Sequence, residues 1–192
     1  TYFDVLRLTV DDKYSWDFAM LGVGLRYING VGKPDMLHYV ESFGMEGHYD
    51  FASNRGYIWS RTFPLLKRAL LLGVGQDNFA YAFPNDDYVG KVNCGFNEQI
   101  ITKPHNMYLQ IWVQDGLPAL LAFLALYLLL FGRTIRKCFK KGKWNHSQKI
   151  SLAFLCGVSG YFVAGLANDS SICVAPVFWI LFGVAFAVLR SE

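Results

Sequence analysis

The side chains of this chain best suited to chemistry are cationic, and they lie in two segments. Arg55, Arg61, Lys67 and Arg68 belong to the first segment, and His105 belongs to the second. Guanidinium and ammonium groups attract anions such as phosphates. A neutral imidazole can take a proton from a hydroxyl, because its unperturbed pKa lies close to the working pH. These residue types are therefore those of anion binding and proton transfer.

The first segment is expected to form a helix in two pieces. Ser53 or Asn54 can cap its start, and Pro64 is expected to bend or end the first piece. The second piece is expected to run from Leu65 to Leu72 and to stop at Gly73-Val74-Gly75, where two glycines allow a tight turn.

Most of these side chains also have a simpler interpretation. Lys67 and Arg68 can attract the anionic head groups of a membrane. His105 can be an interfacial or structural histidine. Arg55 differs, because it lies at the start of the predicted helix, where a positive charge opposes the helix dipole. Helix stability therefore gives no reason for Arg55 to be there.

Three apolar runs follow the two segments. The chain has 192 residues, of which 53% are hydrophobic and 17% aromatic, and the apolar positions gather after about residue 113. The runs at 113–132, 150–168 and 172–190 each approach the length of about 20 residues that spans a bilayer. A buried soluble core is the alternative for any one run, but three in succession predict transmembrane helices. The third run contains Pro176, which neighbouring helices can accommodate.

The connections between the runs predict their orientation. The 133–149 loop carries seven cations and no Asp or Glu, which makes it cytoplasmic by the positive-inside rule: Arg133, Arg136, Lys137, Lys140, Lys141, Lys143 and Lys149. A linker between spans does not suit a nucleic-acid site. The outer turn 169–171 and residues 1–112 are then extracytoplasmic. Because no signal peptide opens the chain, we expect N-terminal transmembrane helices that the sequence lacks.

The second segment leads directly into the first run. Pro104 favours a helix start, and His105 would then share a helical face with Tyr108, Leu109 and Trp112. Tyr and Trp are enriched at membrane interfaces. His105 is therefore expected near the outer membrane surface, at the depth of a lipid-borne diphosphate.

Residues 1–52 are expected to form a loop-rich extracytoplasmic insert with some β-structure, since Tyr2 to Val10 alternates apolar and polar positions. Residues 53–112 are expected to form a helical loop that holds the candidate site. The predicted fold class is thus an all-α integral membrane protein fragment, with three C-terminal transmembrane helices after a long, mostly helical and loop-rich extracytoplasmic segment. The cysteines and histidines show no metal-ligand spacing, so neither a metal nor a cofactor is predicted.

Four short motifs occur in order ahead of the first run. They are Ser53-Asn54-Arg55-x-x-x-Trp59, Leu72-Gly73-Val74-Gly75-x-x-x-Phe79, Pro104-His105-Asn106-x-x-Leu109-Gln110 and Asp115-Gly116-Leu117. In this order they resemble the O-antigen ligase and polymerase superfamily of bacterial envelope polysaccharide synthesis. The resemblance covers residues 53 to 131. Leu70 and Pro118 stand where the family often has Pro and Gly, but neither departure removes a charged group.

The resemblance implies a metal-independent glycosyltransferase of the bacterial cytoplasmic membrane, a multi-pass protein with its site on the extracytoplasmic side. The donor would be a polyprenyl-diphosphate-linked glycan, and the acceptor a hydroxyl of a glycan, lipid or protein. His105 and Arg55 match the family's functional residues: Arg55 would hold the diphosphate, and His105 would orient or deprotonate the acceptor. Substrate-binding residues would be Arg61, Lys67, Arg68 and Asn106.

Alternative functions remain open from the sequence. The resemblance does not separate a ligase, which attaches a finished glycan, from a polymerase, which extends a repeat on the carrier. A non-enzymatic membrane transporter or scaffold is the other class. A transporter is expected to have ionisable residues along its transmembrane helices, whereas the interiors of the three apolar runs contain none after Asp115. This pattern favours chemistry at the membrane surface.

Overall fold

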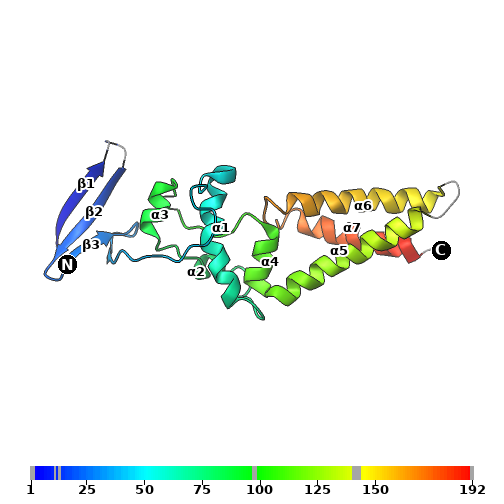
Figure 1. Cartoon of the computed structure of the whole chain (residues 1–192), viewed down its shortest axis with the longest axis horizontal. Helices are drawn as coiled ribbons and strands as arrows, with labels where there is room; N and C mark the ends of the chain where they lie inside the picture. Colours follow the sequence, from blue (N-terminus) through cyan, green and yellow to red (C-terminus); the bar gives the residue numbers. More distant parts are fainter. Residues whose placement is uncertain (1–2, 11, 13, 97–98, 140–143, 191–192) are drawn as a thin grey trace. The chain divides into compact units, whose positions relative to one another are not determined.

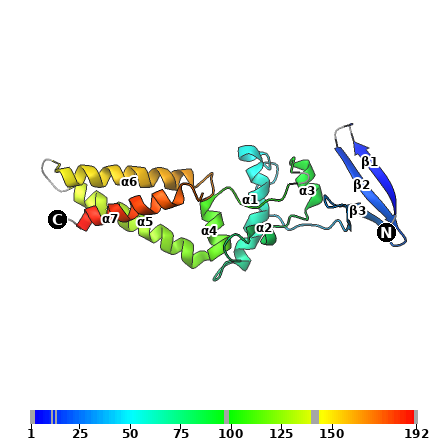
Figure 2. The same ribbon diagram turned by 180° about the vertical axis from the view of Figure 1, so that it is seen from behind.

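A computed structural model of the chain describes residues 3–10, 12, 14–96, 99–139 and 144–190. About half of the chain is helical, and the described residues form seven helices and four strands (Figure 1; Figure 2). They divide into two compact units. Unit 1 comprises Thr1–Leu65 and Ala80–Thr102, and unit 2 comprises Leu66–Phe79 and Lys103–Glu192.

Unit 1 begins with a four-stranded antiparallel sheet whose strands follow one another in chain order. The strands are β1 (Asp4–Val10), β2 (Tyr14–Leu21), β3 (Gly24–Ile28) and β4 (Pro34–Asp35). Leu6 faces Phe18 across β1 and β2, and Arg7 faces Asp17 and forms an exposed salt bridge of 2.6 Å. The strand expected from Tyr2 to Val10 is present as β1, although Tyr2 lies outside the described residues. The predicted all-α fold class did not include this sheet and is wrong in this respect. The alternation of apolar and polar residues that is typical of a strand extends through several strands here.

The helix α1 (Phe51–Arg68) carries the first cationic segment. Its first turn is left-handed: Ala52, Ser53 and Asn54 have φ values of 51°, 62° and 65°, and regular helical geometry follows from Arg55. The cap expected from Ser53 or Asn54 is not formed among the described residues, because both lie in this left-handed turn and not in the extended conformation of an N-cap. The side-chain nitrogen of Asn54 donates to the Cys94 carbonyl at 2.8 Å.

Pro64 does not end α1, contrary to the expectation of two pieces. A proline cannot donate to the carbonyl four residues before it, so the Ser60 carbonyl needs another donor. The backbone N–H of Phe43 donates to that carbonyl at 2.8 Å. This bond satisfies the group that Pro64 leaves open, and α1 continues to Arg68. Two short helices, α2 (Phe79–Ala82) and α3 (Tyr88–Asn93), follow it in the chain.

Unit 2 is built on four helices: α4 (Met107–Asp115), α5 (Leu117–Cys138), α6 (His146–Ala164) and α7 (Ala175–Arg190). The helices α5, α6 and α7 lie side by side (Figure 1; Figure 2). Their core is rich in aromatic rings, and Phe162 stacks on both Phe123 and Tyr127, with ring centroids 4.7 and 4.0 Å apart. The buried cluster is Met107, Phe123, Leu130, Leu155, Val158, Phe162, Phe178, Phe182 and Ala185.

The helix of the first apolar run begins later than expected. The helix is interrupted at Gly116, which has a φ of 93°. Residues 113 to 115 therefore belong to α4, and α5 starts at Leu117. A Cβ on Gly116 would lie 2.5 Å from the Leu71 carbonyl oxygen. Only glycine fits both the dihedral angle and this contact. Pro118 lies in the first turn of α5, where its missing N–H has no helical partner to lose.

The expected loop 133–149 is shorter in the structure. Arg133, Arg136 and Lys137 belong to α5, and Lys149 belongs to α6. Lys140, Lys141 and Lys143 lie outside the described residues. Asn145 caps α6 in a capping box with Gln148, which explains why this helix begins four residues before position 150.

The helix of the third apolar run, α7, starts at Ala175, three residues after the expected position 172, and Pro176 is its second residue. The proline thus lies in the first turn, where the N–H that it lacks would be unpaired in any residue. The expected need for neighbouring helices to compensate Pro176 is therefore wrong. The α6–α7 connection runs from residue 165 to residue 174 and is longer than the predicted turn 169–171.

One helix among the described residues, Leu117–Cys138, is long and apolar enough to cross a membrane, with a mean hydropathy of 1.9. Only 22% of the apolar stretch of this helix is buried inside the protein. Ala175–Arg190 is also apolar, but it is shorter.

Residues 70–75 pack on the end of α4 through backbone groups. The N–H of Val74 donates to the Val113 carbonyl at 2.8 Å, and that of Gly75 donates to the Gln114 carbonyl at 3.0 Å. These bonds satisfy carbonyls that the end of a helix leaves unpaired. A Cβ at Gly73 would collide with the backbone of Gln114. The glycine motif is therefore required for this close approach.

A Gly73→Ala variant is expected to lower stability by about 1–3 kcal/mol, the usual cost of forcing an extra carbon into a packed region. Thermal unfolding of the detergent-purified protein measures the effect. Gly157→Ala is the matched control, since a Cβ at Gly157 in α6 meets nothing within 4 Å. Equal melting temperatures for Gly73→Ala and the wild type would contradict this account of the motif.

Candidate functional site

His105 lies immediately before α4 and not within it. The helix begins at Met107, and Asn106 is its N-cap: the Asn106 side-chain oxygen accepts the backbone N–H groups of Tyr108 and Leu109, both at 3.0 Å. His105 has a φ of 52°, a left-handed conformation that cannot belong to the helix. The expected helix start at Pro104 and the shared face of His105 with Tyr108 are therefore wrong.

The imidazole of His105 has one well-defined partner. Its Nδ1 lies 2.8 Å from Oδ2 of Asp169, and the two side chains are 49% and 11% exposed. The other carboxylate oxygen of Asp169 is buried and has no hydrogen-bond partner among the described residues. With Nδ1–H donated to Asp169, the imidazole keeps the lone pair of Nε2 free. The arrangement suits a base whose tautomer a carboxylate fixes.

The segment that carries Asp169 is anchored to the start of α4. The Met107 N–H donates to the Gly165 carbonyl at 2.8 Å, and the Asn106 side chain donates to the Leu166 carbonyl at 2.9 Å. A Cβ on Gly165 would lie 2.6 Å from the methyl group of Met107. Sequence reasoning treated Asp169 only as part of a turn, although an acidic residue between two apolar runs is a usable signal.

Asn106, a predicted substrate-binding residue, therefore has a structural task on both sides of its amide. The oxygen caps α4, and the nitrogen fixes the residue 165–174 connection. Asn106 therefore joins the start of α4, which directly follows His105 and Asn106, to the connection that carries Asp169.

The other predicted cations divide between the two units: Arg55 and Arg61 belong to unit 1, and Lys67 and Arg68 belong to unit 2. Arg55 is half-buried and makes no hydrogen bond or ion pair within the described chain. Lys67 and Arg68 are exposed in the last turn of α1, where positive charge is favourable for the helix dipole. The charge of Arg55 therefore has neither an acidic partner among the described residues nor a favourable position in the helix dipole.

Arg61 is buried against an acidic partner that the sequence reasoning did not identify. Its Nε donates to Oδ2 of Asp87 at 3.0 Å, and the two side chains are 10% and 8% exposed. The guanidinium also lies over the rings of Tyr49 and Tyr57, 4.9 and 4.5 Å from their centroids. These groups line a cavity of about 510 Å³.

The Asp87 cluster shifts the pKa values of its neighbours. Burial alone would lower the pKa of the Arg61 guanidinium, but its interactions with Tyr49 and Asp87 outweigh burial and raise that pKa. Burial and the Asp87 carboxylate raise the pKa of the Tyr57 hydroxyl, which donates to Asp87 at 3.0 Å. Arg61 therefore stays charged and paired, and Tyr57 stays neutral.

The model of the O-antigen ligase family matches residues 16–124, more than half of the chain. The chain belongs to the O-antigen ligase family. None of the curated proteins matches it, and none of the solved structures does. Members of the O-antigen ligase family act in polysaccharide synthesis and are associated with the membrane.

The O-antigen ligase match extends beyond the motifs on which the resemblance was based. It includes residues 16–50, which carry most of the sheet and which the motifs did not cover. It also includes Arg55, Arg61, Asp87 and His105. Asp169 lies after the matched region, in the connection that follows α6.

Proposed function

We propose that the chain transfers a glycan from a polyprenyl diphosphate to an acceptor hydroxyl at the outer face of the bacterial cytoplasmic membrane. The observation that carries the proposal is the His105–Asp169 pair, 2.8 Å between Nδ1 and Oδ2, in a member of the O-antigen ligase family. A carboxylate-bound imidazole next to a membrane helix is the group that such a transfer needs as its base.

In the proposed reaction, Nε2 of His105 takes the proton of the acceptor hydroxyl. The hydroxyl oxygen attacks the anomeric carbon of the donor sugar, and the bond from that carbon to the diphosphate oxygen breaks. The polyprenyl diphosphate leaves with the electron pair. Arg55 offers its uncompensated guanidinium to the diphosphate oxygens and offsets the charge that develops on them. Cationic side chains thus replace a divalent metal.

The remaining cations have secondary roles in this proposal. Lys67 and Arg68 are exposed and attract the anionic donor or membrane head groups. Asp87 already compensates Arg61, so we assign Arg61 to the wall of the cavity in unit 1.

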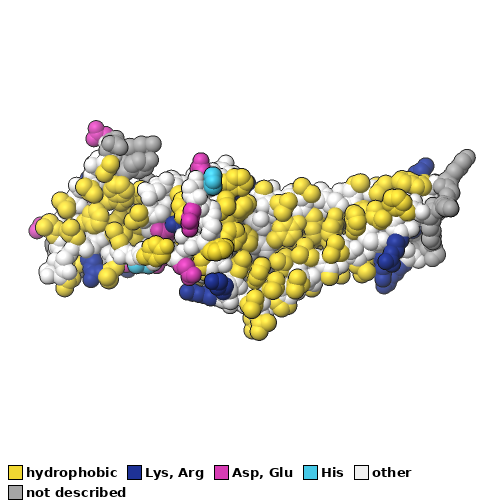
Figure 3. All heavy atoms as spheres, viewed as in Figure 1, with side chains coloured by type: hydrophobic (Ala, Val, Ile, Leu, Met, Phe, Trp, Pro, Cys, Tyr) yellow, Lys and Arg dark blue, Asp and Glu magenta, His cyan; other side chains and the backbone are white. Residues whose placement is uncertain are grey.

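The membrane arrangement of the proposal rests on the surface of unit 2. On the face that Figure 3 shows, the side chains over these helices are mostly hydrophobic, and Leu128 in α5, Val163 in α6 and Ile180 in α7 are more than 60% exposed. Such a surface is unfavourable in water and suits lipid. Arg133, Arg136, Lys149 and Arg190 lie at the end where α5 and α7 finish and α6 begins. We propose that all three helices cross the membrane with this end in the cytoplasm and His105 outside.

The proposal is tested by the variants His105→Ala and Arg55→Ala in the full-length protein, in a strain that lacks the native copy. Each is expected to reduce polysaccharide transfer by about 10²–10⁴-fold, the usual contribution of a general base or of a preorganised charge. Transfer at the wild-type rate by both variants, at normal expression, would exclude the assignment.

The glycan on the carrier lipid distinguishes the two reactions that the proposal includes. If the protein is a ligase, the inactive variants accumulate long chains on the carrier. If it is a polymerase, they accumulate single repeat units.

A further inference from the structure

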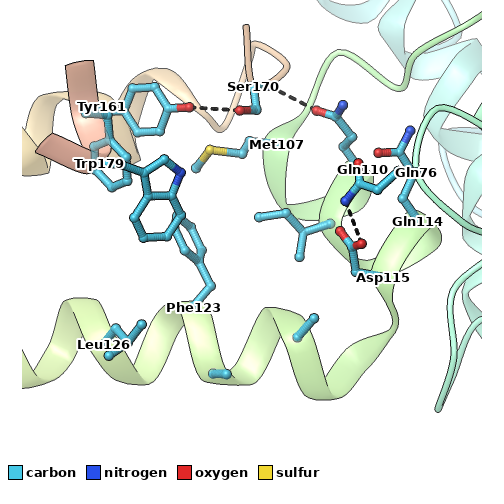
Figure 4. Close-up of a pocket in the computed structure, with 14 residues that line it drawn as sticks. Gln76, Met107, Gln110, Gln114, Asp115, Phe123, Leu126, Tyr161, Ser170 and Trp179 are labelled. Atoms are coloured by element: carbon cyan, nitrogen blue, oxygen red, sulfur yellow. Dashed lines mark hydrogen bonds between the residues drawn. The ribbon is translucent and has the colours of Figure 1, made fainter. Parts of the chain in front are cut away.

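Unit 2 contains a pocket of about 460 Å³ between α4, the start of α5 and the start of α7. Figure 4 shows its two different ends. Amide and carboxylate groups of Gln76, Gln110, Gln114 and Asp115 gather at one end, and the rings of Phe123 and Trp179 lie at the other. None of these side chains has a role in the reaction proposed above.

The polar end is constructed from buried amides. Gln110 and Gln114 are 8% and 4% exposed. Gln110 accepts the Ser170 N–H at 3.0 Å through its side-chain oxygen, and Gln76 donates to Asp115 at 2.6 Å. The side-chain amide of Gln114 makes no hydrogen bond within the described part of the chain. An amide in the wall of a cavity that has no partner within the protein can donate to and accept from a ligand in that cavity.

The apolar end provides a fixed aromatic surface. The Trp179 indole meets the rings of Phe123 and Phe178 edge-on, with centroids 5.9 and 5.2 Å away. These contacts hold the indole at the pocket, and Ala119 and Ala122 leave space in front of it. An aromatic ring beside such a space can pack against the apolar C–H groups on one face of a ring-shaped ligand.

The lining excludes two ligand classes that a membrane protein of this family meets. Among the described residues, no Lys, Arg or His lines the pocket, whereas Asp115 does, so a diphosphate would find no counter-charge there. A hydrocarbon tail would leave the side-chain amide of Gln114 without a partner. The combination of amides, one carboxylate and an indole fits a neutral polyhydroxylated ring.

We propose that this pocket binds a neutral sugar residue of the acceptor glycan. The inference rests on the proposed function, because it assumes a glycan substrate. Ser170 borders the pocket: its N–H donates to Gln110, and its Oγ lies 3.1 Å from the Tyr161 hydroxyl oxygen. Ser170 directly follows Asp169, the partner of His105. Because His105 is the proposed base for the acceptor hydroxyl, we assign this pocket to the acceptor and not to the donor. An acidic sugar is disfavoured by Asp115.

Saturation-transfer NMR on the detergent-purified full-length protein tests the proposal, with methyl glycosides as probes. The neutral probes are those of glucose, galactose and N-acetylglucosamine, and the anionic probe is that of glucuronic acid. At least one neutral probe is expected to bind, and the glucuronide to bind at least tenfold more weakly. Gln114→Leu is expected to weaken neutral binding at least tenfold without lowering the melting temperature, since Gln114 loses no internal hydrogen bond.

Three further variants complete the design. Ala122→Phe fills the pocket and keeps every hydrogen bond, so it should also abolish binding. Gln99→Leu, an exposed glutamine in unit 1, should leave binding unchanged. His105→Ala should bind the sugar like the wild type, so a failure of the proposed function and a failure of this pocket give different results. Unchanged binding in both Gln114→Leu and Ala122→Phe overturns the proposal, as does the absence of binding by every neutral probe or stronger binding of the glucuronide.

Discussion

An Asp169→Ala variant is expected to transfer glycan with a kcat about 10- to 100-fold lower and with unchanged KM values for donor and acceptor. General-base catalysis contributes about 10²–10⁴-fold, and a base that loses its orienting carboxylate keeps only part of that contribution. The carboxylate is 11% exposed and holds Nδ1 of His105 at 2.8 Å. It acts on the imidazole and not on substrate, so binding should not change. Initial rates at varied donor and acceptor concentrations measure the split.

The conservative variant Asp169→Asn separates orientation from charge. Its amide oxygen can still accept the Nδ1–H of His105, so its kcat should fall between those of the wild type and Asp169→Ala. The matched control is Asp86→Ala. This residue forms the other histidine–aspartate pair of the described chain, with 3.2 Å between His38 Nε2 and Asp86 Oδ2, but both side chains are about half exposed. A loss of kcat in Asp86→Ala equal to that in Asp169→Ala would contradict a specific role for Asp169.

The helical part of the fold follows from local sequence features. The three long apolar runs predicted the three long helices of unit 2, with ends that differ from those of α5, α6 and α7 by up to six residues. The errors came from contacts that only the folded chain makes. Gly116 breaks the first run because Leu71 approaches it, and α1 passes through Pro64 because Phe43 supplies a donor to Ser60. Neither contact can be predicted from the local pattern.

The candidate site was predictable only in part for the same reason. Arg55 and His105 stood out by type and by motif. Asp169 is distant from His105 in the sequence, and the residue 165–174 connection brings them together through Met107 and Gly165. The pocket at Gln114 was not predicted either, since Gln114 belongs to none of the four motifs and the role of Gln110 in the pocket depends on its contact with Ser170.

Arg61 shows the opposite case, a cation whose predicted binding role depends on an unseen partner. Sequence reasoning grouped it with substrate-binding residues, but Asp87, 26 residues away, compensates its charge in a buried pair. The Tyr57 hydroxyl shares the same carboxylate oxygen, and the Asp87 side chain also accepts the Gly90 N–H at 3.0 Å at the start of α3. The carboxylate therefore joins α1 to α3 within unit 1.

An Arg61→Met variant is expected to lose about 3–5 kcal/mol of stability, because breaking a buried ion pair leaves an uncompensated charge. The double variant Arg61→Met/Asp87→Leu should regain part of the loss, since it removes the stranded carboxylate as well. Thermal unfolding in detergent measures both. Arg7→Met is the control: its salt bridge with Asp17 has the same residue types at 2.6 Å but is exposed, so no measurable change is expected. If Arg61→Met unfolds like the wild type and instead weakens donor binding, Arg61 belongs to the diphosphate site after all.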